Sequence, residues 1–158
     1  MKLIFSFITA FVLFFQSSVE SLRYSYAKAN LSNANTEAFI NTAEKASGSD
    51  VAVQGYKAAA KIMGAKIAKH NRKAMVKAGA SDLESLIKNN PNNIELRVIR
   101  MSVQENIPKI VGYRGGLKDD KAFILNNYSK QDASLKNYIK RFATQSKTMT
   151  EAEKATLK

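Results

Sequence analysis

Residues 92–106 read NNIELRVIRMSVQEN, and this stretch decides the fold. At about 100° per residue, its apolar side chains fall into two arcs around a helix. The first arc holds Ile94, Val98 and Met101, and the second holds Leu96, Ile99 and Val103. A helix that is apolar on two flanks packs between other helices. The stretch therefore predicts a central helix within a helical domain.

Glu95 lies between the two arcs of this helix. A carboxylate between two packed faces loses its water, and leaving it unpaired there costs several kcal/mol. We therefore expect Glu95 to be mostly buried and paired with an Arg, Lys or Tyr from another helix, with Arg23 as one candidate. The opposite side of the helix carries a polar stripe made of Asn93, Arg97, Arg100 and Gln104.

The rest of the chain repeats apolar residues at spacings of three and four, which indicates amphipathic helices. Helices are expected at about 19–31, 36–46, 51–70 and 72–89, before the central one. Three more are expected after the candidate N-caps Asp119 or Asp120, Asp132 and Thr150. The predicted fold is an all-α, compact bundle of six to eight antiparallel helices, with hairpins of the tetratricopeptide type as one option.

Composition narrows the possible chemistry of this chain of 158 residues. Its length suits one domain, and its formal net charge of +12 favours acidic partners or anionic surfaces. There is no cysteine, which excludes disulfides, thiolate metal sites and cysteine nucleophiles. The single histidine, His70, leaves the usual zinc ligand sets incomplete. No metal site and no cofactor are expected.

The N-terminus has the layout of a secretory signal peptide, with Lys2, an apolar run from Leu3 to Phe15, and small polar residues after it. The run is shorter than the roughly 20 residues of a membrane span. We assign residues 1–18 to the signal, with cleavage between 17 and 21, and keep an uncleaved anchor as the alternative. A periplasmic or extracellular helical domain would then cover 19–147, followed by a short helix or frayed tail at 148–158.

Two local resemblances add to this reading. Residues 72–91, with Gly79, Leu83, Leu86 and Pro91, resemble the second helix of a tetratricopeptide repeat, but the preceding helix does not match that family. Residues 91–123 resemble an uncharacterised family of exported bacterial helical proteins through NIELR at 93–97, Arg100, QENIP at 104–108, Gly112-Tyr113 and Asp120-Lys121. That resemblance implies that Glu95, Arg97, Arg100, Asn106 and Pro108 matter to the family.

A basic block at residues 51–81 is the strongest candidate binding feature. It contains no acidic residue and seven basic ones, which are Lys57, Lys61, Lys66, Lys69, Arg72, Lys73 and Lys77. Such a block attracts polyanions or anionic lipids, but it is more typical of solvated helix faces, because the lysines spread over more than one side of their helix. No aromatic platform interleaves with it, so sequence-specific nucleic-acid binding is not expected. Arg97 and Arg100 are the further candidate anion-binding residues.

Catalytic interpretations are weaker. Glu95 could act as a general base beside Arg97 and Arg100, but it projects about 160° and 140° away from them around the helix. Gly112 begins a glycine-rich stretch that could hold a phosphate, yet it lacks the lysine and serine of a P-loop and is read as a turn. The pair Asp119-Asp120 is read as a helix cap, and His70 as the C-terminal residue of a helix.

The hypothesis from the sequence is therefore an exported, non-catalytic helical interaction domain with a protein partner. The alternative is a binder of polyanions or anionic membranes that uses the basic block. Glu95, Pro91, Pro108 and Gly112 are assigned structural roles, since the prolines end helices and the glycine suits a turn.

Overall fold

The computed structural model describes residues 19–158, so the signal peptide expected at 1–18 lies outside the described residues. Within 19–158 the regular structure is helical and contains no strand, which confirms the all-α class. Residues 19–28 are helical. The remaining helices are α2 (Asn33–Lys45), α3 (Val51–Ile67), α4 (Arg72–Asn89), α5 (Ile94–Asn106), α6 (Leu117–Asn127), α7 (Ala133–Gln145) and α8 (Glu151–Ala155), with 3-10 turns η1 (Lys109–Val111) and η2 (Tyr128–Lys130).

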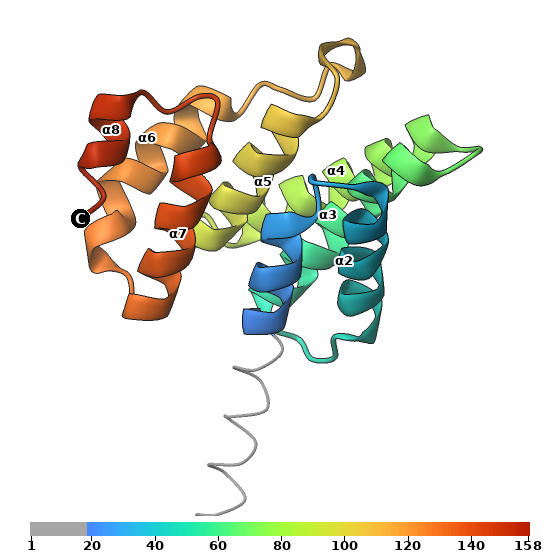
Figure 1. The fold of residues 1–158 in the computed structure, drawn as a ribbon, viewed down its shortest axis with the longest axis horizontal. Coiled ribbons are helices and arrows are strands. Elements are labelled where there is room, and N and C mark those ends of the chain that lie inside the picture. The colour runs from blue at the N-terminus through green and yellow to red at the C-terminus, as the bar shows by residue number, and fades with distance from the viewer. Residues whose placement is uncertain (1–18) are drawn as a thin grey trace, which may run out of the picture.

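α5 lies between two groups of helices (Figure 1). Residues 19–28 with α2, α3 and α4 form one group, and α6, α7 and α8 form the other. α5 contacts α3 and α4 on the first side and α6 and α7 on the second. Eleven of its thirteen residues are buried. The prediction of a central helix is therefore confirmed.

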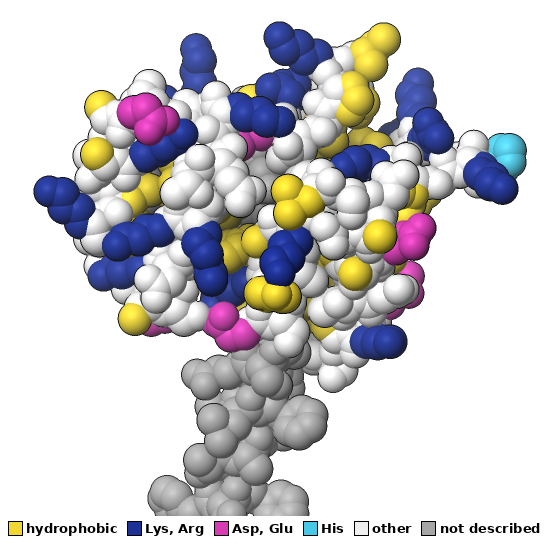
Figure 2. Space-filling view, in the orientation of Figure 1, with side chains coloured by type: hydrophobic (Ala, Val, Ile, Leu, Met, Phe, Trp, Pro, Cys, Tyr) yellow, Lys and Arg dark blue, Asp and Glu magenta, His cyan; other side chains and the backbone are white. Residues whose placement is uncertain are grey.

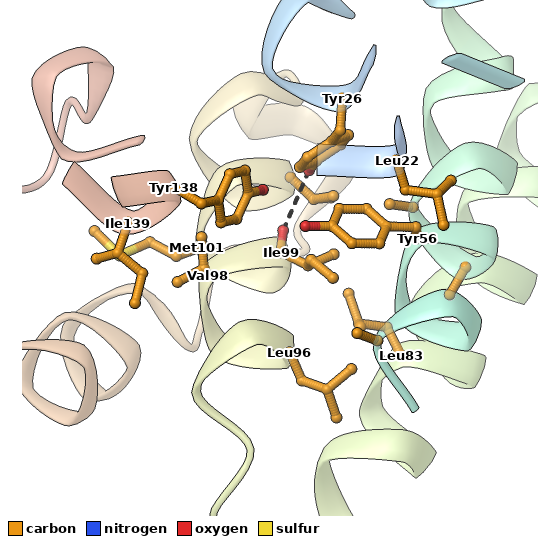
Figure 3. Packing of buried hydrophobic residues seen from close by; sticks show 14 of the residues in the cluster. Leu22, Tyr26, Tyr56, Leu83, Leu96, Val98, Ile99, Met101, Tyr138 and Ile139 are labelled. Carbon is orange, nitrogen blue, oxygen red and sulfur yellow. Dashed lines mark hydrogen bonds between the residues drawn. The ribbon is translucent and has the colours of Figure 1, made fainter. Parts of the chain in front are cut away.

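Aromatic side chains connect the two groups beside α5, and their hydroxyl ends turn toward one another (Figure 3). The ring centroid of Tyr26 lies 5.4 Å from that of Tyr56, and Tyr56 lies 6.5 Å from Tyr138. The Tyr26 hydroxyl donates a hydrogen bond of 3.3 Å to the carbonyl oxygen of Ile99. Burying an aromatic side chain contributes roughly 1.5–3 kcal/mol. This cluster therefore holds the first helical segment and α7 against the central helix.

Short polar side chains set several helix starts as expected. Asp50 accepts from the backbone N–H groups of Ala52 and Val53, and Asp132 accepts from that of Leu135. The prediction that the second helix starts at Thr36 was wrong, because Ser32 caps the backbone N–H of Asn35 and α2 begins at Asn33. The expected asparagine-rich turn is thus half helical.

Small residues let α3 approach its neighbours closely. A Cβ atom on Gly79 of α4 would lie 2.6 Å from the carbonyl oxygen of Ala58, and one on Gly55 would lie 2.6 Å from Leu96 Cδ2. A larger side chain at Gly79 would therefore push α4 away from the α3 backbone.

The C-terminal residues form a packed helix. Thr150 and Glu153 make a capping box at the start of α8, and Met149 and Leu157 on either side of α8 are buried. Lys121 Nζ lies 2.8 Å from Glu153 Oε1, which ties α8 to α6. None of the helices described within 19–158 is both long enough and apolar enough to cross a membrane.

Candidate functional site

Glu95 is buried, with 4% of its surface exposed, and paired as expected. Arg23 Nε donates to Glu95 Oε1 at 2.8 Å, and Arg23 Nη2 donates to Oε2 at 2.7 Å. The Tyr56 hydroxyl also donates to Oε1, at 2.8 Å. The prediction of a buried Glu95 paired with Arg23 is confirmed. We name Arg23, Tyr56 and Glu95 the Glu95 network.

The Glu95 network is saturated rather than reactive. Burial lowers the pKa of the Arg23 guanidinium, but the Glu95 carboxylate more than offsets this and raises that pKa above its usual value. Burial also raises the pKa of the Tyr56 hydroxyl, and Tyr138 and Glu95 add to the rise. Charged arginine and neutral tyrosine thus both donate to one carboxylate. Three donors engage both oxygens of Glu95, and its near-complete burial keeps a substrate away from it.

The polar stripe of α5 binds another part of the protein, which we name the Asp120 network. Arg100 Nε and Nη2 donate to the two carboxylate oxygens of Asp120 at 2.7 and 2.6 Å, and Arg97 Nη1 donates to Asp120 Oδ1 at 3.2 Å. Glu84 completes the Asp120 network by accepting from Arg100 Nη1 at 2.6 Å and from the Tyr113 hydroxyl at 2.7 Å. The candidate anion-binding arginines are therefore neutralised internally.

Asp119 and Asp120 do not cap α6, so that prediction was wrong. The helix already begins at Leu117, its N-cap is Gly116 without a side-chain cap, and Asp120 is fully buried. The backbone N–H of Gly116 donates to Gln104 Oε1 at 3.1 Å. A side chain from α5 thus binds the N-cap residue of α6, and the Asp120 carboxylate binds Arg100 instead of the helix N-terminus.

The basic block at 51–81 is divided among different surfaces. Lys61 Nζ forms an ion pair of 2.5 Å with Asp82 on α4, whereas Lys66 Nζ reaches Asn30 Oδ1 at 3.2 Å. Lys57 and Lys66 lie about 180° apart around α3. Lys69, Arg72, Lys73 and Lys77 are exposed in the α3–α4 loop and on α4. Figure 2 shows Lys and Arg side chains spread over the visible face instead of gathered in one patch.

His70 does not end a helix, so that expectation was also wrong. α3 ends at Ile67, and His70 is exposed in the loop before α4. The other structural candidates lie at helix ends: Pro91 follows α4, and Pro108 precedes η1. Gly112 has a φ of 76°, a left-handed conformation that favours glycine.

An open apolar groove runs along α3 between α2 and the start of α4, and we name it the α3 groove. Its volume is about 660 Å³. Its floor and walls are Ile40, Ala43, Ala60, Gly64, Ile67, Ala68 and Met75. Glu44, Lys57 and Lys61 form its charged rim. Met75 lies over Gly64, where a Cβ atom would come within 2.8 Å of the Met75 methyl carbon.

A smaller and more enclosed pocket lies between residues 26–30, α5 and α7, and we name it the Glu105 pocket. Its volume is about 180 Å³. Its polar and aromatic lining includes Tyr26, Ser102, Glu105, Tyr138, Arg141 and Lys147. Glu105 is only 5% exposed. Sequence reasoning missed it, although Glu105 projects only about 80° from Glu95 around the same helix.

No cluster of three or more residues suited to holding a metal ion occurs within residues 19–158. Comparison with known proteins found no matching family model, no similar curated protein and no similar solved structure. Residues 19–158 thus form an all-α fold that contains the Glu95 network, the Asp120 network, the α3 groove and the Glu105 pocket.

Proposed function

We propose that this chain is a non-catalytic helical interaction domain that acts after export, and that its partner docks in the α3 groove. The observation that carries the proposal is the groove itself, an open apolar surface bounded by three helices. Export rests on the sequence of residues 1–18 alone. The absence of catalysis is inferred from Glu95 and Asp120, because arginines already neutralise both of these buried carboxylates.

The occupant that fits the α3 groove is an amphipathic helix of a partner protein. From Lys57 to Ile67 the groove follows α3 for about 15 Å, close to three helical turns. Its floor of small residues, Ala43, Ala60 and Gly64, gives room for large apolar side chains of the partner. Helices recognised in this way present anchors at i, i+3 or i+4 and i+7, which span about 10 Å and fit within this length.

The charges near the groove favour a partner helix with acidic flanks. Lys57 makes no ion pair among the described residues, and the exposed Lys69, Arg72 and Lys73 follow the end of the groove at Ala68. Glu44 is the one carboxylate on the rim, while Lys61 is already bound to Asp82. A second copy of this chain fits less well, because two chains of net charge +12 repel each other.

Binding of polyanions or anionic membranes is the weaker alternative. Such binding is strongest where cations share one surface, whereas Lys61 and Lys66 of the basic block contact different neighbours. The two functions also differ in which side chains they need, because a docked helix needs the apolar floor and a polyanion does not.

A binding experiment with helical peptides tests the proposal. Synthetic amphipathic helices with Leu anchors at i, i+4 and i+7 would be prepared in an acidic and a basic version and titrated by fluorescence anisotropy. We expect the acidic version to bind at least tenfold more tightly than the basic one. Ile67→Glu should weaken that binding at least tenfold, since it places a charge in the groove.

Leu31→Glu is the matched control, because Leu31 is an exposed apolar residue outside the groove, with 71% of its surface accessible. It should leave binding unchanged. Equal loss in the two variants would contradict docking in the α3 groove. Binding to heparin or anionic vesicles that is tighter than peptide binding and insensitive to Ile67→Glu would favour the alternative. Substrate turnover by the pure protein that Glu95→Gln abolishes would overturn the non-catalytic assignment.

A further inference from the structure

The Glu105 pocket contains a buried carboxylate with one oxygen in use and one free. Glu105 Oε1 accepts from Ser146 Oγ at 2.6 Å and from the backbone N–H of Thr148 at 2.9 Å. Within residues 19–158 no group donates a hydrogen bond to Oε2, although Glu105 lines the pocket. Glu105 as a residue is 5% exposed and lines the pocket, so a donor that enters the pocket can reach this free oxygen.

The surroundings of Glu105 suit the hydrogens of an ammonium group. Tyr26 and Ser102 bring hydroxyl groups to the same pocket, and Tyr138 and Phe142 bring aromatic rings. Burial raises the pKa of the Tyr26 hydroxyl above its usual value, and the nearby Glu105 carboxylate adds to the rise, so this hydroxyl stays neutral. Hydroxyl oxygens and ring faces both attract a cation, which adds to the attraction by the carboxylate.

Positive charge, opposite to that of Glu105, surrounds the mouth of the Glu105 pocket. Arg141 and Lys147 line it and are exposed. Lys147 Nζ is held by Asn106 Oδ1 at 2.9 Å, while Arg141 makes no ion pair among the described residues. A simple cation entering the pocket would pass two like charges, and a simple anion would end beside Glu105. A ligand that carries both charges matches both ends of the pocket.

We propose that the Glu105 pocket binds a small zwitterionic amino acid, with its ammonium group on Glu105 and its carboxylate toward Arg141 and Lys147. The pocket volume of about 180 Å³ limits the size of the ligand. Pockets for drug-sized ligands are larger, at roughly 300–1,000 Å³. Glycine and L-alanine are therefore the natural probes. This site is separate from the α3 groove and does not depend on the proposed function.

Isothermal titration calorimetry with L-alanine and glycine tests the proposal, with methylamine and acetate as ligands that carry only one of the two charges. We expect saturable binding of the amino acids and at least tenfold weaker binding of methylamine and acetate. Glu105→Gln keeps an oxygen for Ser146 and Thr148 but removes the negative charge, so the fold should persist. This variant should bind alanine at least tenfold more weakly, because a charge-assisted hydrogen bond is lost. Arg141→Gln should weaken the binding of L-alanine several-fold.

Matched controls separate the pocket from the overall charge of the chain. Glu44→Gln makes the same change in the rim of the α3 groove, and Lys118→Gln removes an exposed cation elsewhere. Both should bind alanine as the parent protein does. Amino acids that show no saturable binding, methylamine that binds as tightly as alanine, or a Glu105→Gln variant of unchanged affinity would each overturn the proposal. Circular dichroism of Glu105→Gln verifies that a loss of binding does not come from unfolding.

Discussion

The Glu95 network and the Asp120 network both bury a carboxylate on or beside α5, but they connect the chain over different distances. Glu95 binds Arg23, 72 residues away, and Tyr56, 39 residues away. Asp120 binds Arg100, which is only 20 residues away and sits on the preceding helix. The first network therefore depends on the packing of residues 19–28 and α3 against α5, whereas the second joins α5 to α6, with a further link to α4 through Glu84. Glu95 and Asp120 are both buried, so the two networks differ in where the partners of these carboxylates lie in the chain and not in burial.

The largest expected effect is the loss of Glu95. Glu95→Ala leaves Arg23 without its main partner and Tyr56 without an acceptor, in a site that water scarcely reaches. We expect a decrease of about 3–5 kcal/mol in the free energy of unfolding, measured by urea denaturation. Asp82→Ala, which breaks the exposed pair with Lys61, should cost less than about 1 kcal/mol. Equal, small losses in both variants would contradict the burial of Glu95.

Loss of Asp120 should be somewhat milder and more local. Asp120→Ala removes the carboxylate from Arg100 and Arg97, but Arg100 keeps its 2.6 Å pair with Glu84. We expect a decrease of about 3 kcal/mol, at the lower end of the range for a broken buried pair. Limited trypsin digestion should cut Asp120→Ala first within 117–130. It should cut Glu95→Ala first within 19–67, where the segments that bind Glu95 lie. Identical cleavage patterns in the two variants would mean that the chain unfolds as one cooperative unit, and would contradict a local effect of Asp120→Ala.

The smallest effects concern the tyrosines that donate to each network. Burial raises the pKa of Tyr56 and of Tyr113 above the usual value of about 10, with further rises from Tyr138 and Glu95 at Tyr56 and from Glu84 at Tyr113. Because the folded state holds these protons more tightly, their contribution to stability is complete below pH about 10 and is lost as the pH rises through the folded values. In contrast, the hydrogen bond from Lys28 lowers the pKa of exposed Tyr24.

An ultraviolet absorbance titration should therefore show one early tyrosine step without loss of helicity. Tyr56 and Tyr113 should ionise later, together with alkaline unfolding seen by circular dichroism. Tyr24→Phe is the control, since it should remove only the early step. Ionisation of all tyrosines near pH 10 in a folded protein would contradict the burial of both donors.

Much of the Glu95 network could be predicted from sequence, because helical periodicity places Glu95 between two apolar arcs whatever the loops do. The Asp120 network could not. An aspartate early in a helix is usually a cap, and here the cap position belongs to Gly116, whose N–H binds Gln104. A Cβ atom on Gly116 would lie 2.9 Å from the Arg100 guanidinium, so the glycine also makes room for that arginine. Such placement depends on the path of residues 107–116, which periodicity does not encode.

Helical periodicity also limits which surface features can be predicted from the sequence. The sequence shows that residues 51–81 are rich in basic residues. Which surface each of them reaches depends on how α3 is rotated between α2 and α4. The Glu105 pocket combines three segments distant in sequence, and the α3 groove depends on how three consecutive helices pack. The all-α class and the central helix can be predicted by considering each helix separately. The groove and the pocket cannot, because they depend on how the helices pack together.

The near-complete burial of α5 has a kinetic consequence. Its backbone amides can reach solvent only when both groups of helices separate, so their hydrogen exchange should require global unfolding. The five-residue α8 lies at the edge of the fold, so its amides should exchange sooner than those of α5. Deuterium uptake at α5 would then report the stability of the whole domain, and a ligand that binds the folded state at any one surface would slow exchange at α5 as well.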